Sequence, residues 1–110
     1  MHVIRHPLPA PCPGTQRDIV SFHYGTPGGR KAYLQASLHA DELPGMLVAH
    51  HVRARLAQLE AAGRIDGEIV VVPVANPVGV AQVVQGSPFG RFDLASGINF
   101  NRGFKHLTPQ

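Results

Sequence analysis

The feature that most constrains the fold of this chain is the apolar run at residues 68–74, Glu-Ile-Val-Val-Val-Pro-Val. The run shows no alternation of apolar and polar residues, which is typical of a parallel strand that is buried on both faces. A strand of this kind needs a layer of secondary structure on each side. The sequence therefore predicts an α/β fold with this strand in its interior.

A helix is predicted immediately before this strand. Four apolar residues recur at helical spacing: Val48, Val52, Leu56 and Leu59. Pro44 suits the first turn of a helix, where its missing N–H is no loss, and Gly63 is expected to be the left-handed cap. A largely apolar strand is expected at residues 31–38. Strand, helix and strand in this order predict a right-handed βαβ unit.

The chain before this unit is expected to form a hairpin. Residues 17–24 alternate partly and predict a strand, and the turn cluster at residues 25–29 should connect it to the strand at residues 31–38. Residues 1–14 carry a proline at every second position from Pro7 to Pro13. Because proline opposes both helix and ladder pairing, this segment is expected to be an extended arm outside the domain formed by residues 15–110.

The predicted inventory of elements is incomplete. After a turn at residues 76–79, residues 80–110 show little periodicity and many glycines, and a long stretch of this kind tends to be functional. Only one helix is expected, although the central strand needs cover on both faces. Either the chain associates with something or the rest of the domain is missing.

Composition excludes several classes of protein. The 110 residues fit one small domain, and 44% apolar with 15% charged residues indicates a globular chain. The net charge of +3 comes from scattered arginines without an interleaved aromatic stripe, so nucleic-acid binding is not expected. Cys12 is the only cysteine, so no intrachain disulfide can form. With no signal-peptide core and no run long enough for a membrane span, we expect a cytoplasmic protein that does not enter the membrane.

His39 and Glu42 are the first candidate site residues. They are three residues apart, at the point where the strand at residues 31–38 should give way to the helix. The carboxyl end of a strand is where open α/β sheets place ligands, and imidazole and carboxylate are both good zinc ligands. We therefore expect two of the three protein ligands of a catalytic zinc ion. The alternative is that Glu42 is an early-helix acid favoured by the helix dipole and His39 an ordinary strand-end histidine.

Two further groups lie in the glycine-rich stretch. Asn101 and Arg102 could hold a substrate carboxylate, since arginine offers a planar fork and asparagine adds a donor. Arg91 could stabilise the oxyanion that forms when a carbonyl is attacked. Each of these residues could equally be a solvated loop residue. The remaining histidines have no partner at ligand spacing or lie within the predicted helix: His2, His6, His23, His50, His51 and His106.

Residues 33–102 resemble the succinylglutamate desuccinylase/aspartoacylase family, which belongs to the wider zinc carboxypeptidase (M14) class. Three blocks in order carry the resemblance: Leu-His-Ala-Asp-Glu-Leu-Pro-Gly at residues 38–45, Ile-Val-Val-Val-Pro-Val-Ala-Asn-Pro at residues 69–77, and Asn-Phe-Asn-Arg-Gly-Phe at residues 99–104. The resemblance implies a three-layer α/β sandwich around a mixed sheet, of which this chain would supply the amino-terminal portion with its hairpin and βαβ unit.

The resemblance also implies a site and an activity. His39 and Glu42 would bind Zn²⁺, Asn101 and Arg102 would bind the carboxylate of the substrate, and Arg91 would be the oxyanion arginine. The implied reaction is hydrolysis of the amide bond of an N-acyl amino acid, in which zinc activates water and polarises the carbonyl.

One departure from the family pattern leaves three interpretations open. The family's second zinc histidine and its general-base glutamate lie beyond the position of Arg102 and have no counterpart in this chain. The first interpretation is therefore a deacylase fragment that is inactive as it stands. The second is a non-catalytic fragment or binding module that associates with a partner through the glycine- and arginine-rich loop. The third is a homo-oligomer in which a neighbour's histidine completes the zinc site.

Overall fold

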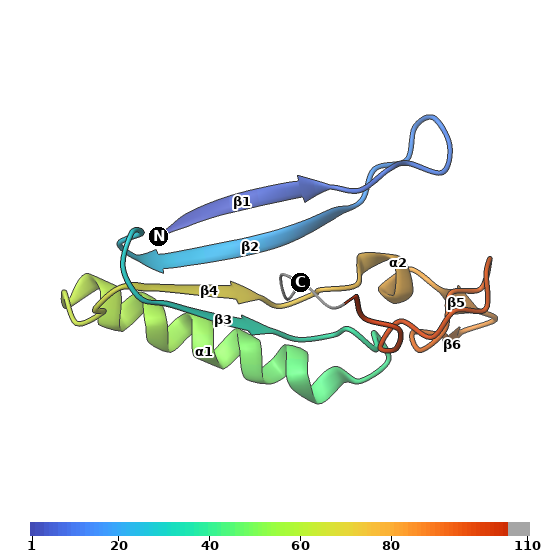
Figure 1. Cartoon of the computed structure of the whole chain (residues 1–110). Helices are drawn as coiled ribbons and strands as arrows, with labels where there is room; N and C mark the ends of the chain where they lie inside the picture. The colour runs from blue at the N-terminus through green and yellow to red at the C-terminus, as the bar shows by residue number, and fades with distance from the viewer. Residues whose placement is uncertain (106–110) are drawn as a thin grey trace.

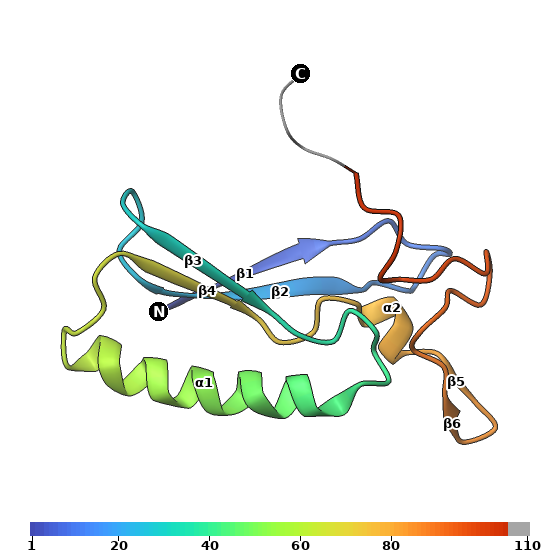
Figure 2. The same ribbon diagram turned by 60° about the horizontal axis from the view of Figure 1, so that its bottom comes forward.

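A mixed four-stranded sheet forms the body of the molecule in this computed structural model, which describes residues 1–105 (Figure 1). The strands are β1 (His2–Pro7), β2 (Asp18–Gly25), β3 (Lys31–Gln35) and β4 (Glu68–Val72), in the spatial order β1-β2-β4-β3. Helix α1 (Leu43–Ala61) lies along one face of the sheet (Figure 2). Beyond β4 the chain forms α2 (Pro77–Val80) and a small ribbon of β5 (Val83–Val84) and β6 (Ser87–Pro88).

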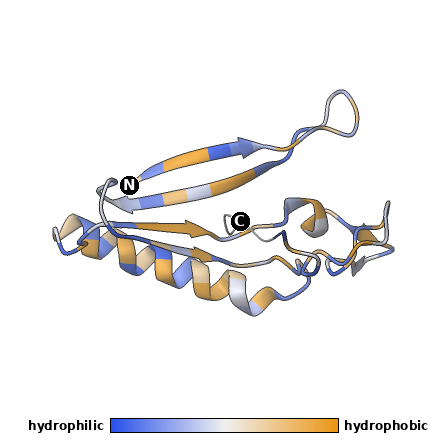
Figure 3. Ribbon diagram, viewed as in Figure 1, coloured by the Kyte–Doolittle hydropathy of each residue, from blue (hydrophilic) through white to orange (hydrophobic). Residues whose placement is uncertain are grey.

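The predicted βαβ unit is confirmed. Strands β3 and β4 pair in parallel from Lys31 opposite Glu68 to Gln35 opposite Val72, and α1 connects them. Strand β4 is hydrophobic along most of its length (Figure 3), and Val71 is fully buried. Both strands are shorter than predicted, and the expected turn at residues 76–79 largely coincides with the single turn of α2.

The predicted hairpin between the second and third strands is wrong. Strand β4 lies between β2 and β3, and β2 pairs antiparallel with β4. The glycine-rich turn instead carries the chain across the end of β4. Thr26 N–H donates to the carbonyl oxygen of Gly67 at 2.8 Å, and a Cβ atom on Gly25 would lie 2.2 Å from that oxygen. Strand β4, the most apolar one, is thus paired on both sides, with β2 and with β3. The composition of the turn at residues 25–29 could not reveal this arrangement.

The expectation that the proline-rich segment makes no ladder is also wrong. Residues His2–Pro7 form β1, which pairs antiparallel with β2. Pro7 occupies the last paired position, opposite Asp18, and the later prolines follow the strand. Proline is tolerated at this place because β1 is an edge strand. The boundary between an arm at residues 1–14 and a domain at residues 15–110 stays a prediction.

The face of α1 that meets the sheet is rotated from the predicted one. Ala49 and Leu56 are buried against Tyr24 and Val71, with Val52 and Leu59 packed beside them. Val48 is 57% exposed, so its assignment to the buried face is wrong. The predicted cap is confirmed, because Gly63 has a φ of +67° and its N–H donates to the carbonyl oxygen of Glu60 at 3.0 Å.

The face of the sheet opposite α1 has no covering helix among residues 1–105 (Figure 2). It carries a chain of polar contacts across all four strands: Lys31 Nζ to Glu68 Oε1 at 3.1 Å, Glu68 Oε1 to His23 Nδ1 at 3.6 Å, His23 Nε2 to Ser21 Oγ at 2.8 Å, and Ser21 Oγ to His6 Nε2 at 2.9 Å. A hollow of about 360 Å³ lies over these residues. The described residues therefore form two layers of the expected three.

No helix within residues 1–105 combines the length and the apolar character that crossing a membrane requires.

We expect Leu56→Ala to lower the free energy of unfolding by about 2–5 kcal/mol, since it removes buried methyl groups from the contact between α1 and the sheet. Val48→Ala is the matched control on the same helix and should change it by less than about 0.5 kcal/mol. Urea denaturation of both variants measures the difference. Equal losses would contradict the packing of α1 described above.

The Lys31 ammonium lowers the pKa of Glu68 below its ordinary value of 4.5, while burial acts in the opposite direction. A lowered folded-state pKa stabilises the fold above the unfolded-state pKa, and that stability is lost as the pH falls through the folded-state value. Lys31→Met should therefore be less stable than the unaltered chain at pH 7.

The difference should shrink as the pH falls below 4.5 and through the lowered pKa of Glu68, where this carboxyl becomes protonated in the folded chain as well as in the unfolded one. Urea denaturation at a series of pH values tests this expectation, with Lys105→Met as the control for removal of a lysine. A stability difference that is independent of pH would contradict it.

Candidate metal centre

His39 lies in the turn that connects β3 to α1, and its side chain is buried with 4% exposure. The sheet pairing continues briefly past β3, because Ala36 N–H donates to the carbonyl oxygen of Val72 at 3.0 Å. Ser37 then adopts a φ of +64°, a left-handed conformation that is uncommon for a residue with a side chain. This reversal ends the strand and begins the turn that carries His39 and Glu42.

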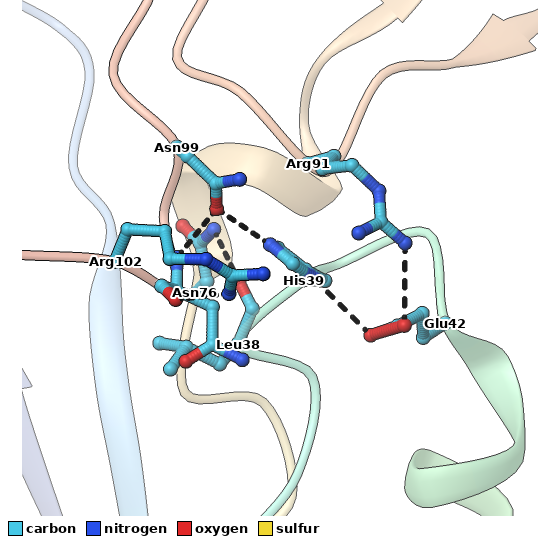
Figure 4. A network of polar contacts seen from close by, with 8 residues as sticks. Leu38, His39, Glu42, Asn76, Arg91, Asn99 and Arg102 are labelled. Atoms are coloured by element: carbon cyan, nitrogen blue, oxygen red, sulfur yellow. Dashed lines mark hydrogen bonds and ion pairs between the residues drawn. The ribbon is translucent and has the colours of Figure 1, made fainter.

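Asn99 determines which nitrogen of His39 carries a proton. The oxygen Oδ1 of Asn99 accepts a hydrogen bond from the backbone N–H of Asn101 at 2.9 Å, so the atom facing this N–H must be the amide oxygen. The same oxygen lies 2.7 Å from His39 Nε2 (Figure 4). Nε2 must therefore donate, which assigns the proton of neutral His39 to Nε2 and leaves the lone pair on Nδ1.

The free nitrogen of His39 faces the carboxylate of Glu42. His39 Nδ1 and Glu42 Oε2 are 3.4 Å apart. A tetrahedral zinc ion with bonds of about 2.0–2.2 Å holds neighbouring donor atoms roughly 3.3–3.6 Å apart. The backbone keeps the two residues together, since Glu42 N–H donates to the carbonyl oxygen of His39 at 3.1 Å. The spacing and the donor types of this pair therefore fit a shared metal ion.

A hairpin-like loop brings Arg91 and Asn99 to this turn. Phe92 and Asn99 form an isolated antiparallel bridge, and Asp93 closes the loop between them. The Asp93 carboxylate accepts hydrogen bonds from the hydroxyl and the backbone N–H of Ser96 at 2.6 and 3.1 Å, and these bonds lower the pKa of Asp93. Arg91 then places its Nη2 atom 3.3 Å from Glu42 Oε1 (Figure 4).

Asn76 joins the ends of β3 and β4 beneath the site. This buried residue donates from Nδ2 to the carbonyl oxygen of Leu38 at 2.9 Å and accepts from Gly79 N–H at 2.9 Å. The carbonyl of Leu38 immediately precedes His39 in the chain. Asn76 therefore holds the turn at the residue next to the candidate ligand, and at the same time caps α2.

The structure brings the other predicted site residues to the same region. Asn101 contacts Asn99 through its backbone, and the exposed Arg102 donates to the carbonyl oxygen of Asn101 at 2.6 Å (Figure 4). Asn99 and Asn76 were not predicted to have these roles. Each stood within a block that carries the family resemblance, but an asparagine in a loop gives no local sign of what it will bind.

A third metal ligand is not found in the part of the chain that the structure describes. Among residues 1–105, no group of three His, Cys, Asp or Glu side chains is arranged to hold a metal ion. His23 belongs to the polar chain on the open sheet face, and His50 and His51 contact each other edge to face on α1. His106 lies outside the described residues.

Comparison with a family model covers most of the chain. The model described as the succinylglutamate desuccinylase/aspartoacylase catalytic domain matches residues 28–108. No curated protein matches the chain.

Solved structures match almost the full chain. A succinylglutamate desuccinylase/aspartoacylase family protein from Shewanella amazonensis SB2B has a TM-score of 0.75 and 29% identity, over 99% of this chain. A second from Shewanella frigidimarina NCIMB 400 has a TM-score of 0.70 and 26% identity, over 97% of this chain. An aspartoacylase family protein from Mesorhizobium loti, at 22% identity and a TM-score of 0.57 over 84% of this chain, shows a likeness of fold alone. The chain spans 28% of the length of each.

We expect Asn76→Asp to lower the free energy of unfolding by about 1–3 kcal/mol, because a carboxylate cannot donate to the Leu38 carbonyl and would leave that carbonyl unpaired. Asn101→Asp is the matched control, since it makes the same chemical change at a less buried residue. Chemical denaturation at pH 7 compares the two variants. A smaller loss for Asn76→Asp than for Asn101→Asp would contradict the role assigned to Asn76.

Proposed function

The chain belongs to the succinylglutamate desuccinylase/aspartoacylase family, and on that premise we propose that it supplies part of the site of a zinc-dependent amide hydrolase. The proposed substrate is an N-acyl amino acid or a similar amide that bears a carboxylate. One observation carries the proposal: His39 Nδ1 and Glu42 Oε2 lie 3.4 Å apart, and Asn99 keeps the proton of His39 on the other nitrogen.

The contacts of His39 support a ligand role over that of an ordinary strand-end histidine. Metal-binding histidines almost always donate their second ring N–H to a carboxylate, a carbonyl or water. Asn99 supplies such a carbonyl to His39, at 2.7 Å. A metal ligand must also offer an unprotonated nitrogen. The hydrogen bond to Asn99 favours the tautomer with the proton on Nε2, which leaves Nδ1 free to bind a metal. The carboxylate of Glu42 is 57% exposed and can turn toward an ion without losing a buried partner.

In this proposal each residue has a distinct task. His39 and Glu42 hold Zn²⁺, which when bound lowers the pKa of a coordinated water and polarises a carbonyl. Arg91 donates to the oxygen on which negative charge develops. Asn101 and Arg102 orient the substrate by binding its carboxylate, for which the planar guanidinium is well suited. Asn99 contacts both His39 Nε2 and the backbone N–H of Asn101, and this link between His39 and the segment of Asn101 and Arg102 supports the division of roles.

The third zinc ligand and the general base are proposed to come from outside the described residues. Catalytic zinc sites use three protein ligands and keep one position open. Two candidate ligands stand together in residues 1–105. The rest of a catalytic protein of the relatives' length, or a second copy of this chain, would have to supply the others.

We propose that the same additional polypeptide forms the third layer of the sandwich. Strand β4 is apolar on both faces, and α1 covers only one of them (Figure 2). The other face has a hollow floored by Val70 and Val72, of the kind that a helix with an apolar face would fill.

A binding module without a metal is the second candidate function. It is favoured by the exposed apolar residues of the loop that carries Arg91 and Arg102: Phe89, Phe92, Leu94, Ile98 and Phe104. Such a surface would bind a carboxylate-bearing partner through the two arginines and bury the apolar residues around them.

A zinc titration of the 110-residue chain by calorimetry tests the metal site. We expect one zinc ion per chain, with affinity strongly reduced in His39→Ala and Glu42→Ala because each removes a direct ligand. The control is His50→Ala, which removes an exposed histidine from the middle of α1. Zinc binding that is equal in the unaltered chain and in His39→Ala would overturn the proposed site.

Activity is measured with the same proteins on N-acyl amino acids such as N-succinylglutamate, with and without zinc. Zinc-dependent hydrolysis that His39→Ala abolishes would place a complete site in this chain or its oligomer. Tight zinc binding without hydrolysis would confine the chain to its metal-binding part. Carboxylate binding that neither zinc nor His39→Ala affects would favour the binding module.

A further inference from the structure

The backbone of Arg91 is fixed against the turn that carries both proposed zinc ligands. Ala40 N–H donates to the carbonyl oxygen of Gly90 at 2.8 Å, and Phe100 N–H donates to the carbonyl oxygen of Arg91 at 3.0 Å. Gly90 approaches the turn so closely that a Cβ atom on it would lie 2.3 Å from the backbone nitrogen of Asp41. The start of the Arg91 side chain is therefore held beside Glu42 by contacts that do not involve the guanidinium.

The guanidinium distinguishes the two oxygens of the Glu42 carboxylate. Arg91 Nη2 lies 3.3 Å from Oε1, whereas Oε2 lies 3.4 Å from His39 Nδ1 (Figure 4). One oxygen is thus held by a cation, and the other faces the nitrogen lone pair with which it would share an ion. A free carboxylate on an exposed glutamate would sample many other orientations.

We propose that Arg91 is a positioning residue for Glu42: it holds Oε1 so that Oε2 is the oxygen presented to the metal. This inference rests on the proposed function and adds to the oxyanion role of Arg91. The guanidinium has five N–H donors, so the contact with Glu42 leaves others for a substrate oxygen. As a salt bridge between half-exposed groups, the pair contributes little to stability. Its effect on the affinity for zinc is larger, because substituting a residue that holds a metal ligand typically lowers metal affinity by about 10–100-fold.

The affinity for zinc in the absence of substrate separates the two roles. An oxyanion donor acts only when a substrate is present, so removing it should leave zinc binding unchanged. Electrostatics alone predicts the opposite of a positioning role, since removing a nearby positive charge should strengthen the binding of a cation. Weaker zinc binding after loss of Arg91 therefore has to come from the freed carboxylate of Glu42.

The experiment is a titration of the 110-residue chain with Zn²⁺ alone, for the unaltered chain, Arg91→Ala, Arg91→Lys and Arg102→Ala. We expect Arg91→Ala to weaken zinc binding by about 10-fold, the lower end of the range for such partners because the pair is half exposed. Arg91→Lys should recover part of the loss, because an ammonium can still hold Oε1. Arg102→Ala removes the same charge from the same loop and should leave the affinity unchanged or slightly higher.

Each other outcome overturns the inference in a recognisable way. Equal or tighter zinc binding by Arg91→Ala would remove the positioning role and leave the metal site in place. Equal losses in Arg91→Ala and Arg102→Ala would assign the effect to the loop as a whole. Zinc binding that is absent from the unaltered chain would overturn the pair of His39 and Glu42 as a metal site in this chain, and the role of Arg91 with it. Circular dichroism and thermal midpoints show whether each variant is folded, and Arg91→Lys provides the test if Arg91→Ala is not.

Discussion

The parallel pairing of β3 with β4 is the interaction on which the rest of the structure depends. Because the two strands run side by side in the same direction, their carboxyl ends meet at one edge of the sheet. The turn with His39 leaves the first strand at this edge, and Asn76 follows the second. The hydrogen bond from Asn76 to the carbonyl of Leu38 then ties the two exits together. Without this pairing, the family's sequence blocks would remain separate segments of chain.

The candidate site is assembled from three segments, and each proposed ligand is oriented by a residue far from it in sequence. His39 is oriented by Asn99, sixty positions away, and Glu42 by Arg91, forty-nine positions away. Both partners reach the turn because the bridge between Phe92 and Asn99 folds their loop back on itself. The site therefore consists of two donors on a local turn and a loop that determines which atoms those donors present.

The predictions from sequence failed where the choice of partner was not local. The turn at residues 25–29 has the composition of a hairpin, yet β4 takes the place beside β2 because burying its apolar residues outweighs the preference of a short loop. The proline-rich segment at residues 1–14 was expected to stay unpaired. Its first residues instead pair as β1 with the edge of β2 that β4 does not occupy, and an edge strand tolerates Pro7. Val48 was placed in the core because it lies one helical turn before Val52, whereas the stripe that meets the sheet includes Ala49 in its place.

The sequence by itself determined several elements and two candidate metal ligands: an apolar strand, a helix between two strands, the glycine cap, the family, and a histidine and a glutamate three residues apart. These follow from periodicity, backbone preferences and side-chain type, which act over a few residues. Only the tertiary structure decided the strand order, the buried stripe of α1, the tautomer of His39 and the contact of Arg91 with Glu42. These depend on which distant surfaces pack together, since burial and hydrogen bonding over the whole fold outweigh any single local preference.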